Sequence, residues 1–234
     1  MSRTLVVGDI HGCAREFGDL LNGLAVVDGD SIVLVGDLVA KGPASCEVLA
    51  IAREVGAVAI RGNHEARLLR WRHGSNAKAP SDHLTALARG IDEEGWAQIE
   101  AMPLWVKLPQ HDVLVVHAGL VPGRPVESQD EHDLLHMRCI DESGRPDARR
   151  PPPGAEERLW GHHYAGSPHV VFGHNAMDEP QLHPAATGLD TGCVYGGQLT
   201  ALILAKNEHV TVDSEQRRAQ LFSVPARESY VPLD

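Results

Sequence analysis

The stretch that decides the fold is TLVVGDIHG, at residues 4–12. Its first four residues, Thr4 to Val7, form a short aliphatic and β-branched run, which is typical of a buried strand. Gly8-Asp9 then interrupts the run, and residues 15–24 follow with apolar side chains at helical spacing. A strand, a turn and a helix in this order form a βα unit, so we expect a parallel sheet flanked by helices.

The same pattern returns along the chain. Four further apolar runs are expected to be strands, each followed by a turn: residues 31–35, 57–60, 113–116 and 170–172. Helices are expected over residues 47–55 and 66–71, then a polar loop over 73–80 and a further helix start at the acidic residues 92–94. The repetition predicts one α/β domain that spans residues 1–234.

Two later segments depart from this rhythm. Residues 127–168 contain Gly144-Arg145-Pro146 and three consecutive prolines at 151–153, so we expect an irregular excursion outside the sheet. Residues 199–204 and 209–212 are both rich in strand-forming side chains, and we expect them to close the fold as an antiparallel hairpin.

Composition limits the possible partners. The formal net charge is −11, so no overall attraction to nucleic acid or to an anionic membrane is expected. Four cysteines are far apart and form no CxxC pair, which favours a reducing cytoplasm over a disulfide framework. No apolar run approaches the roughly 18 residues of a membrane span or resembles a signal peptide, so we expect a cytoplasmic protein.

Six side chains that can bind metals fall at or just after the expected strand ends. They are Asp9, His11, Asp37, Asn63, His117 and His174. Because the carboxyl ends of strands form the ligand-binding edge of an open α/β sheet, these distant residues can meet in one site. The mixture of imidazoles, carboxylates and an amide suits Mn²⁺, Fe, Zn²⁺ or Co²⁺ better than an all-oxygen Mg²⁺ site. Six ligands exceed the needs of one tetrahedral ion and predict two divalent ions, bridged by Asp37.

The five motifs GDIHG, GDLVAKGP, RGNHE, HAGL and FGH resemble, in this order, the signatures of the calcineurin-like metallophosphoesterases. The resemblance implies a four-layer α/β/β/α sandwich with a dinuclear site, for which Mn²⁺ is the expected metal. It places Asp9 and His11 on one metal and Asp37 between the two. The other metal would be held by Asn63, His117 and His174. His64 matches the position of the general acid that protonates the leaving oxygen.

The segment after Asp37 bears on the substrate. Phosphoprotein phosphatases typically read GDxVDRG, whereas here Ala40 replaces the aspartate that partners the catalytic histidine, and Lys41 replaces the arginine. An unassisted His64 suits a phosphoanhydride, because a phosphate leaving group needs little protonation. This segment and residues 189–197, LDTGCVYGG, are similar to the symmetrical diadenosine tetraphosphate hydrolases.

The resemblance therefore implies symmetrical hydrolysis of diadenosine tetraphosphate to two ADP, by in-line attack of a metal-bridging hydroxide. Two alternatives stay open. A compact, open site would also suit a serine/threonine or broad-specificity protein phosphatase acting on phosphoproteins. A metal-binding scaffold without turnover is the other alternative, which the intact ligand set and His64 disfavour.

Further residues are assigned by their chemistry. Lys41, Asn63 and Arg138 are expected to contact substrate phosphates. For Asp190, the start of a turn is preferred over a hydrogen bond to a metal-binding histidine. Three aromatic residues could stack on adenine or belong to the core: Trp160, Tyr164 and Tyr195.

Overall fold

The computed structural model describes residues 2–74 and 82–232. Its first sheet has the N-terminal strand in the middle. Its five strands are β1 (Arg3–Val7), β2 (Ser31–Leu34), β3 (Val58–Ala59), β11 (Gln198–Ala205) and β12 (Leu221–Pro225). They lie in the order β12-β11-β1-β2-β3. The three N-terminal strands are parallel, and β11 and β12 extend the sheet antiparallel. The expected βα units therefore supply three of the five strands of a mixed sheet.

The second sheet comes from the later part of the chain. Its strands are β4 (Trp105–Leu108), β5 (Val113–Val116), β8 (His169–Phe172), β9 (Gln181–Leu182) and β10 (Ala186–Gly188), in the order β4-β5-β8-β10-β9. The central strands β5, β8 and β10 are parallel, whereas β4 and β9 are antiparallel edges. The sequence patterns missed β4, β9 and β10, two of which have only two or three residues.

Successive residues of the central strands point into different cores. Val6 of β1 and Val115 of β5 belong to an apolar cluster shared by the two sheets, while Leu5 and Val7 face the other side of the first sheet. Leu114 of β5 likewise faces the outer side of the second sheet. The side-chain period of two thus gives each sheet two buried faces and explains why the strands read as continuous apolar runs.

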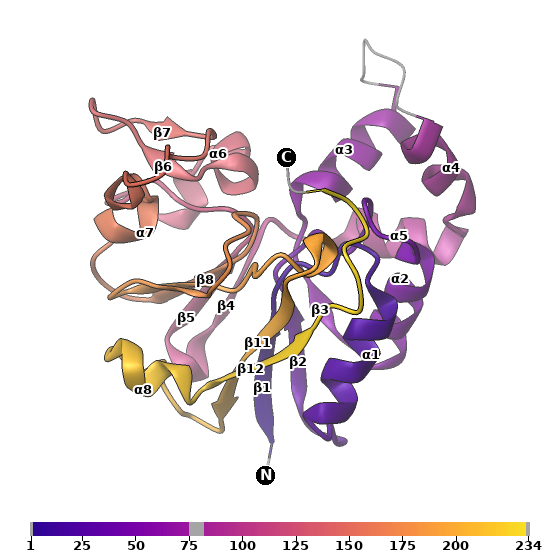
Figure 1. The fold of residues 1–234 in the computed structure, drawn as a ribbon, viewed down its shortest axis with the longest axis horizontal. Helices are drawn as coiled ribbons and strands as arrows, with labels where there is room; N and C mark the ends of the chain where they lie inside the picture. Colours follow the sequence, from indigo (N-terminus) through magenta and orange to yellow (C-terminus); the bar gives the residue numbers. More distant parts are fainter. Residues whose placement is uncertain (1, 75–81, 233–234) are drawn as a thin grey trace.

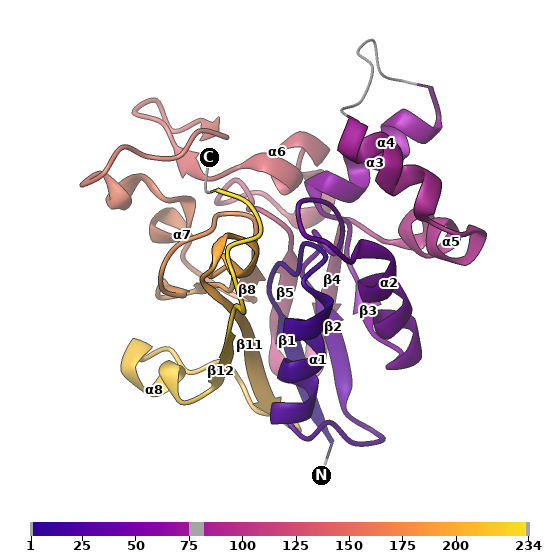
Figure 2. The same ribbon diagram turned by 45° about the vertical axis from the view of Figure 1, so that its right-hand side comes forward.

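Helices cover the outer faces of both sheets. The first sheet is covered by α1 (Ala14–Gly23), α2 (Ser45–Glu54), α3 (Asn63–Arg72), α4 (Asp82–Gly90) and α5 (Glu93–Ala101). The second carries α6 (Glu131–His136), α7 (Trp160–His163) and the two-stranded β6 (Cys139–Ile140) and β7 (Pro146–Asp147). The views in Figures 1 and 2 show these layers on opposite sides of the paired sheets. The four-layer α/β/β/α sandwich is confirmed.

Short elements complete the chain. They are η1 (Pro109–His111), η2 (Val126–Ser128), η3 (Glu156–Arg158), η4 (Cys193–Tyr195) and α8 (Ser214–Arg218). The excursion over 127–168 adds no strand to either main sheet, as expected, but contains α6, β6, β7 and α7. Most of the loop expected over 73–80 lies outside the described residues. No helix in the described ranges has the length and apolar character needed to cross a bilayer.

Two sequence predictions about element boundaries were wrong. Residues 209–212 are not a strand, and the antiparallel partner of β11 is β12, which follows α8. The backbone around residue 211 is satisfied by side chains, since Thr211 N donates to Gln220 Oε1 and Thr211 O accepts from Arg217. The helix expected from residue 66 begins at Asn63, because Glu65 accepts a hydrogen bond from Gly62 N and caps the helix there.

Candidate metal centre

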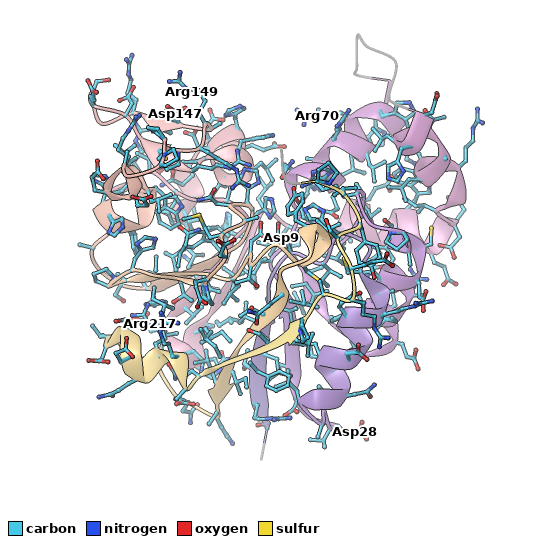
Figure 3. The ribbon with its side chains drawn as sticks, in the orientation of Figure 1. Asp9, Asp28, Arg70, Asp147, Arg149 and Arg217 are labelled. Carbon is cyan, nitrogen blue, oxygen red and sulfur yellow. The ribbon has the colours of Figure 1, made fainter. Side chains whose placement is uncertain are left out.

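The six expected ligands lie at the carboxyl ends of strands from both sheets. Asp9 follows β1, Asp37 follows β2, and Asn63 opens the helix after β3. His117 and His174 follow β5 and β8 of the second sheet. Figure 3 places Asp9 at this edge, between the two halves of the molecule. Because the two sheets pack face to face, residues up to 165 positions apart in the sequence meet at this edge.

Asp37 occupies the middle of the site. Its Oδ2 lies 3.4 Å from His11 Nε2, and its Oδ1 lies 3.5 Å from His117 Nε2. Two groups of possible ligand atoms share this carboxylate, one with His11 and His64 and one with His117 and His174, each within 4.8 Å. One carboxylate with a histidine-containing group on each oxygen has the form of a bridge between two ion sites.

The side of the site toward the second sheet is a tight cluster of three residues. Asn63 Oδ1 lies 3.0 Å from both His117 Nε2 and His174 Nδ1. His174 Nε2 is buried and has no hydrogen-bond partner among the described residues. Burial, followed by the charge of His117, holds the pKa of His174 well below its usual value, so its imidazole is neutral and available as a ligand.

Asp9 occupies the other side of the site, with His11. Both of its carboxylate oxygens accept a hydrogen bond from His174 N at 3.1 Å, and Oδ2 lies 3.9 Å from His11 Nε2. Burial, and then the charges of Asp190 and Asp37, raise the pKa of Asp9 well above its usual value. The repulsion between three buried carboxylates can be relieved by protonation or by bound cations, so the cluster is suited to divalent metal ions.

The histidine ring orientations test whether cations fit. His11 Nδ1 lies 3.2 Å from Val39 O and His117 Nδ1 lies 2.8 Å from Val35 O. A carbonyl can only accept, so each Nδ1 donates its proton there and each Nε2 is turned toward Asp37. Burial lowers the pKa of His11 to about 3, which keeps that ring neutral. Lone pairs that converge on carboxylate oxygens, backed by N–H to carbonyl bonds, are the arrangement of metal-binding histidines. The donor set fits two divalent ions.

Glu65 holds two of the site's loops together. Its carboxylate accepts hydrogen bonds from four backbone N–H groups: Asp37, Leu38, Val39 and Gly62. Burial, and then the charge of Asp37, raise the pKa of Glu65 to about 7. The motif RGNHE contains this residue, but the sequence reading gave it no role. Its position three residues after Gly62, as in a capping box, was the available signal.

Strained backbone and close approaches mark the same loops. The φ angles of His11, Asp37 and His174 are 49°, 51° and 66°, a left-handed conformation that non-glycine residues adopt at an energetic cost. Two positions must be glycine because a carboxylate lies against each of them. A Cβ on Gly173 would lie 1.9 Å from Asp9 Oδ1, and one on Gly62 would lie 2.2 Å from Asp37 Oδ1. The loops are shaped around the ligands at the expense of local stability.

His64 stands beside the candidate ligands, on the first turn of α3. Its backbone N donates to Asp37 Oδ1 at 2.9 Å, and its Nε2 lies 4.0 Å from Asp37 Oδ2. In the described ranges Asp37 is the only carboxylate within ion-pair distance of this ring. Burial lowers the pKa of His64 to about 4. Ala40, which lies in the same cavity wall, supplies no partner for it.

The two expected phosphate-binding cations differ in their placement. Lys41 Nζ lies 3.3 Å from His11 Nε2 and donates to the Tyr195 hydroxyl, so it reaches the site. Arg138 donates from Nη1 to Ala148 O, while its Nε is buried without a partner in the described part of the chain. Burial, and then the charge of Arg150, lower the pKa of Arg138, whose own charge acts on His174.

Other expected residues have structural contacts. Asp190 Oδ1 accepts from Gly192 N, in agreement with the expected turn. Trp160 is buried and donates to Ala118 O, and Tyr164 donates to Pro168 O, so both belong to the packing of the second sheet. Tyr195 alone of the three aromatic residues lines a cavity beside the site.

Comparisons with known proteins agree with this geometry. The family model of the calcineurin-like phosphoesterases matches residues 2–212. Two relatives named bis(5'-nucleosyl)-tetraphosphatase PrpE [asymmetrical] are each 31% identical. The one from Oceanobacillus iheyensis aligns over 90% of this chain and 92% of its own length. The one from Anoxybacillus flavithermus aligns over 89% and 93%. A crystal structure to which diadenosine tetraphosphatase activity is attributed is 34% identical, with a TM-score of 0.79 over 96% of this chain and 93% of its own.

Proposed function

This chain belongs to the calcineurin-like phosphoesterase family, and on that premise we propose that it hydrolyses a phosphoanhydride bond of dinucleoside tetraphosphates with two bound metal ions. The observation that carries the proposal is the central position of Asp37, between His11 on one side and His117 on the other. Asp9 and His11 would hold one ion. Asn63, His117 and His174 would hold the second, with Asp37 shared by both.

Bound metal ions would supply positive charge for the phosphoryl oxygens and would activate water as the nucleophile. Mn²⁺ is the proposed ion, because the shell mixes imidazole nitrogens with carboxylate and amide oxygens. Replacement of Asp37 by Asn, followed by elemental analysis, tests the shared ligand. We expect a loss of both metals, and two retained metals per chain would contradict the bridge.

His64 is proposed as the proton donor to the leaving oxygen; because burial lowers its pKa to about 4, the negative charge of the bound substrate would have to raise that pKa. It lies at the edge of the ligand cluster and opens on a cavity, so a leaving group can reach it. Lys41, Asn63 and Arg138 are proposed to orient the phosphate oxygens. Replacement of His64 by Ala should lower kcat about 10²-fold or more while the metal content stays the same. A loss of metal with that variant would assign His64 to the metal shell.

In the described ranges His64 has no carboxylate partner other than the candidate metal ligand Asp37, which favours an anhydride substrate. An alkoxide leaving group needs strong protonation, whereas a nucleotide leaving through a phosphate oxygen, with a pKa near 6, departs readily. Ala40, where a protein phosphatase carries aspartate, leaves His64 with Asp37 alone within ion-pair distance in the described ranges. Dinucleoside tetraphosphate is therefore proposed ahead of a phosphoprotein.

The position of cleavage is a separate part of the proposal. The sequence motifs led us to expect the symmetrical reaction, which yields ADP alone. Relatives that align over nine tenths of their length carry the asymmetrical name, which favours ATP and AMP as products. We therefore propose asymmetrical cleavage, with symmetrical cleavage as the alternative.

Incubation of the purified protein with diadenosine tetraphosphate and Mn²⁺, followed by ion-exchange chromatography, tests the reaction. ATP plus AMP in equal amounts supports the proposal, and ADP alone restores the symmetrical assignment. A parallel assay with a phosphoserine peptide addresses the protein phosphatase alternative. Turnover of the peptide with an intact dinucleotide would refute the anhydride substrate. The free state of all four cysteines accords with a proposed cytoplasmic location.

A further inference from the structure

A cavity of about 430 Å³ adjoins the candidate metal centre on the side of His64. Its described lining includes Lys41, His64, Arg67, His83, Leu84, Tyr195 and residues 231–232 near the C-terminus. The volume falls within the range of small-molecule sites, about 300 to 1,000 Å³. Because His64 belongs to both the cavity wall and the reaction site, a molecule bound here would touch the leaving-group side.

The charge of this cavity is opposite to that of the protein. Lys41 and Arg67 contribute positively charged side chains to its wall, and none of its described lining residues is Asp or Glu. Four other cavities of similar size each include a carboxylate, such as Glu47 or Glu100. In a chain of net charge −11, a cavity with cations and no acid in its described wall is selective for an anion.

Arg67 is placed to act on the same ligand as His64. It lies three residues later on α3, so both side chains share one face of the helix. Its side chain is exposed, and its charge is close enough to disfavour protonation of His64. A guanidinium in this position can bind a phosphate oxygen bidentately. The sequence reading did not identify Arg67, although its spacing from His64 was visible.

The lining also includes aromatic and apolar side chains. The Tyr195 ring lies 4.9 Å from Lys41 Nζ, and its hydroxyl accepts a hydrogen bond from that lysine. Leu84 is buried and adds an apolar surface. The C-terminal segment is fixed beside Tyr195, since the backbone N atoms of Tyr230 and Val231 both donate to Val194 O. An aromatic face next to two cations combines the groups that recognise a base and its phosphates.

We propose that this cavity binds the leaving nucleotide, AMP, with Lys41 and Arg67 on its 5′-phosphate and Tyr195 against its base. The assignment rests on the proposed function, because it places a nucleotide beside the bond that the metal centre would cleave. It adds a specificity residue, Arg67, that contacts substrate without contacting the metals. An aryl phosphate, which has neither a nucleoside nor a second phosphate, makes little use of the cavity.

The kinetic test compares Arg67→Gln with Arg89→Gln. Arg89 is exposed near the C-terminal end of α4 and lies outside the described lining of the cavity. Its replacement removes one positive charge, as Arg67→Gln does, and therefore serves as the matched control. For Arg67→Gln, kcat/KM for diadenosine tetraphosphate should fall about tenfold further than kcat/KM for p-nitrophenyl phosphate. The Arg89 variant should keep the wild-type ratio. An unchanged ratio in Arg67→Gln, or an equal change in both variants, overturns the assignment.

A binding measurement separates this assignment from the proposed reaction. Calorimetric titration of the Mn²⁺-loaded protein with AMP should show binding that weakens about tenfold in Arg67→Gln and is unchanged in Arg89→Gln. If AMP binds in this manner while the dinucleotide is not hydrolysed, the proposed function fails and the cavity assignment stands. If the dinucleotide is hydrolysed and AMP affinity is independent of Arg67, the cavity assignment fails alone.

Discussion

Two buried charges organise opposite ends of the molecule, and they do so for different purposes. Glu65 gathers four backbone N–H groups at the edge that carries the candidate ligands. Arg217 donates to five backbone carbonyls at the lower end of the sheets: Thr211, Val212, His183, Pro184 and Ala186. Figure 3 shows Arg217, which belongs to α8, below Asp9. In both places a buried charged side chain hydrogen-bonds main-chain groups. At one end this positions the loops of the candidate site, and at the other it holds the C-terminal segment in place.

The difference lies in what surrounds each charge. Glu65 lies against Asp37, and the repulsion between the two carboxylates adds to burial in raising the pKa of Glu65. Arg217 is fully buried and has no carboxylate within ion-pair distance in the described ranges. Glu65 is therefore tied to the chemistry of the metal centre, whereas Arg217 is tied to the fold of the C-terminal segment.

The largest effect is expected from Glu65→Gln. The glutamine side chain has the same shape as glutamate, but its NH₂ group would face two backbone N–H groups that need an acceptor. Each buried N–H group left unpaired costs about 1 to 3 kcal/mol. Metal affinity and kcat/KM should fall 10- to 100-fold, and the unfolding free energy should fall by several kcal/mol. Elemental analysis, steady-state kinetics and urea denaturation measure these changes. The exposed Glu94→Gln is the control. A variant with full metal content and activity would show that Glu65 does not position the site.

Arg217→Met should affect stability without affecting the site. The buried carbonyls would lose their donor, so the unfolding free energy should fall by about 3 kcal/mol. The kcat of the folded protein should stay within twofold of wild type. Urea denaturation and kinetics at low temperature test this, with the neighbouring exposed Arg218→Met as the control. A large loss of kcat in the folded variant would contradict the division between the two ends.

Acid should destabilise the second sheet through His183. Burial, and then the charges of His162 and Arg217, lower the pKa of His183 to about 4. In the unfolded chain His183 binds a proton below about pH 6.5. The stabilising contribution of the neutral His183 is therefore complete above that pH and is lost as the pH falls toward 4. The contribution amounts to about 2 kcal/mol between pH 7 and pH 5. Urea denaturation of His183→Gln should show a smaller pH dependence than wild type, whereas the exposed His209→Gln should match wild type.

The smallest effect is expected from Ala40→Asp, which changes only the functional end. The φ of Ala40 is 69°, a conformation that aspartate tolerates better than alanine, so the variant should fold. A carboxylate beside His64 should shift the ratio of kcat/KM several-fold toward aryl phosphate esters and away from the dinucleotide. Competition assays measure that ratio. No shift would remove the leaving-group argument for an anhydride substrate.

The first half of the chain was more predictable than the second. Strands β1, β2, β3 and β5 and the helices α1 and α2 were found within a few residues, because each has an apolar run and a turn in sequence. The short strands β9 and β10 carry little local signal and form only by pairing in the second sheet. The wrong hairpin had the same cause, since β12 pairs with β11 across the intervening α8.

The sequence by itself determined which residues we propose as metal ligands, because ligand type and strand-end position are encoded within a few residues of each motif. Only the tertiary structure decided that Asp37 lies between His11 and His117, and that Glu65 holds the loops of Asp37 and Asn63 together. It also decided that Arg217, the first arginine of the polar run SEQRR, is buried, and that Arg67, Tyr195 and the C-terminal segment share a cavity. These contacts join residues from distant parts of the chain, so no local pattern records them.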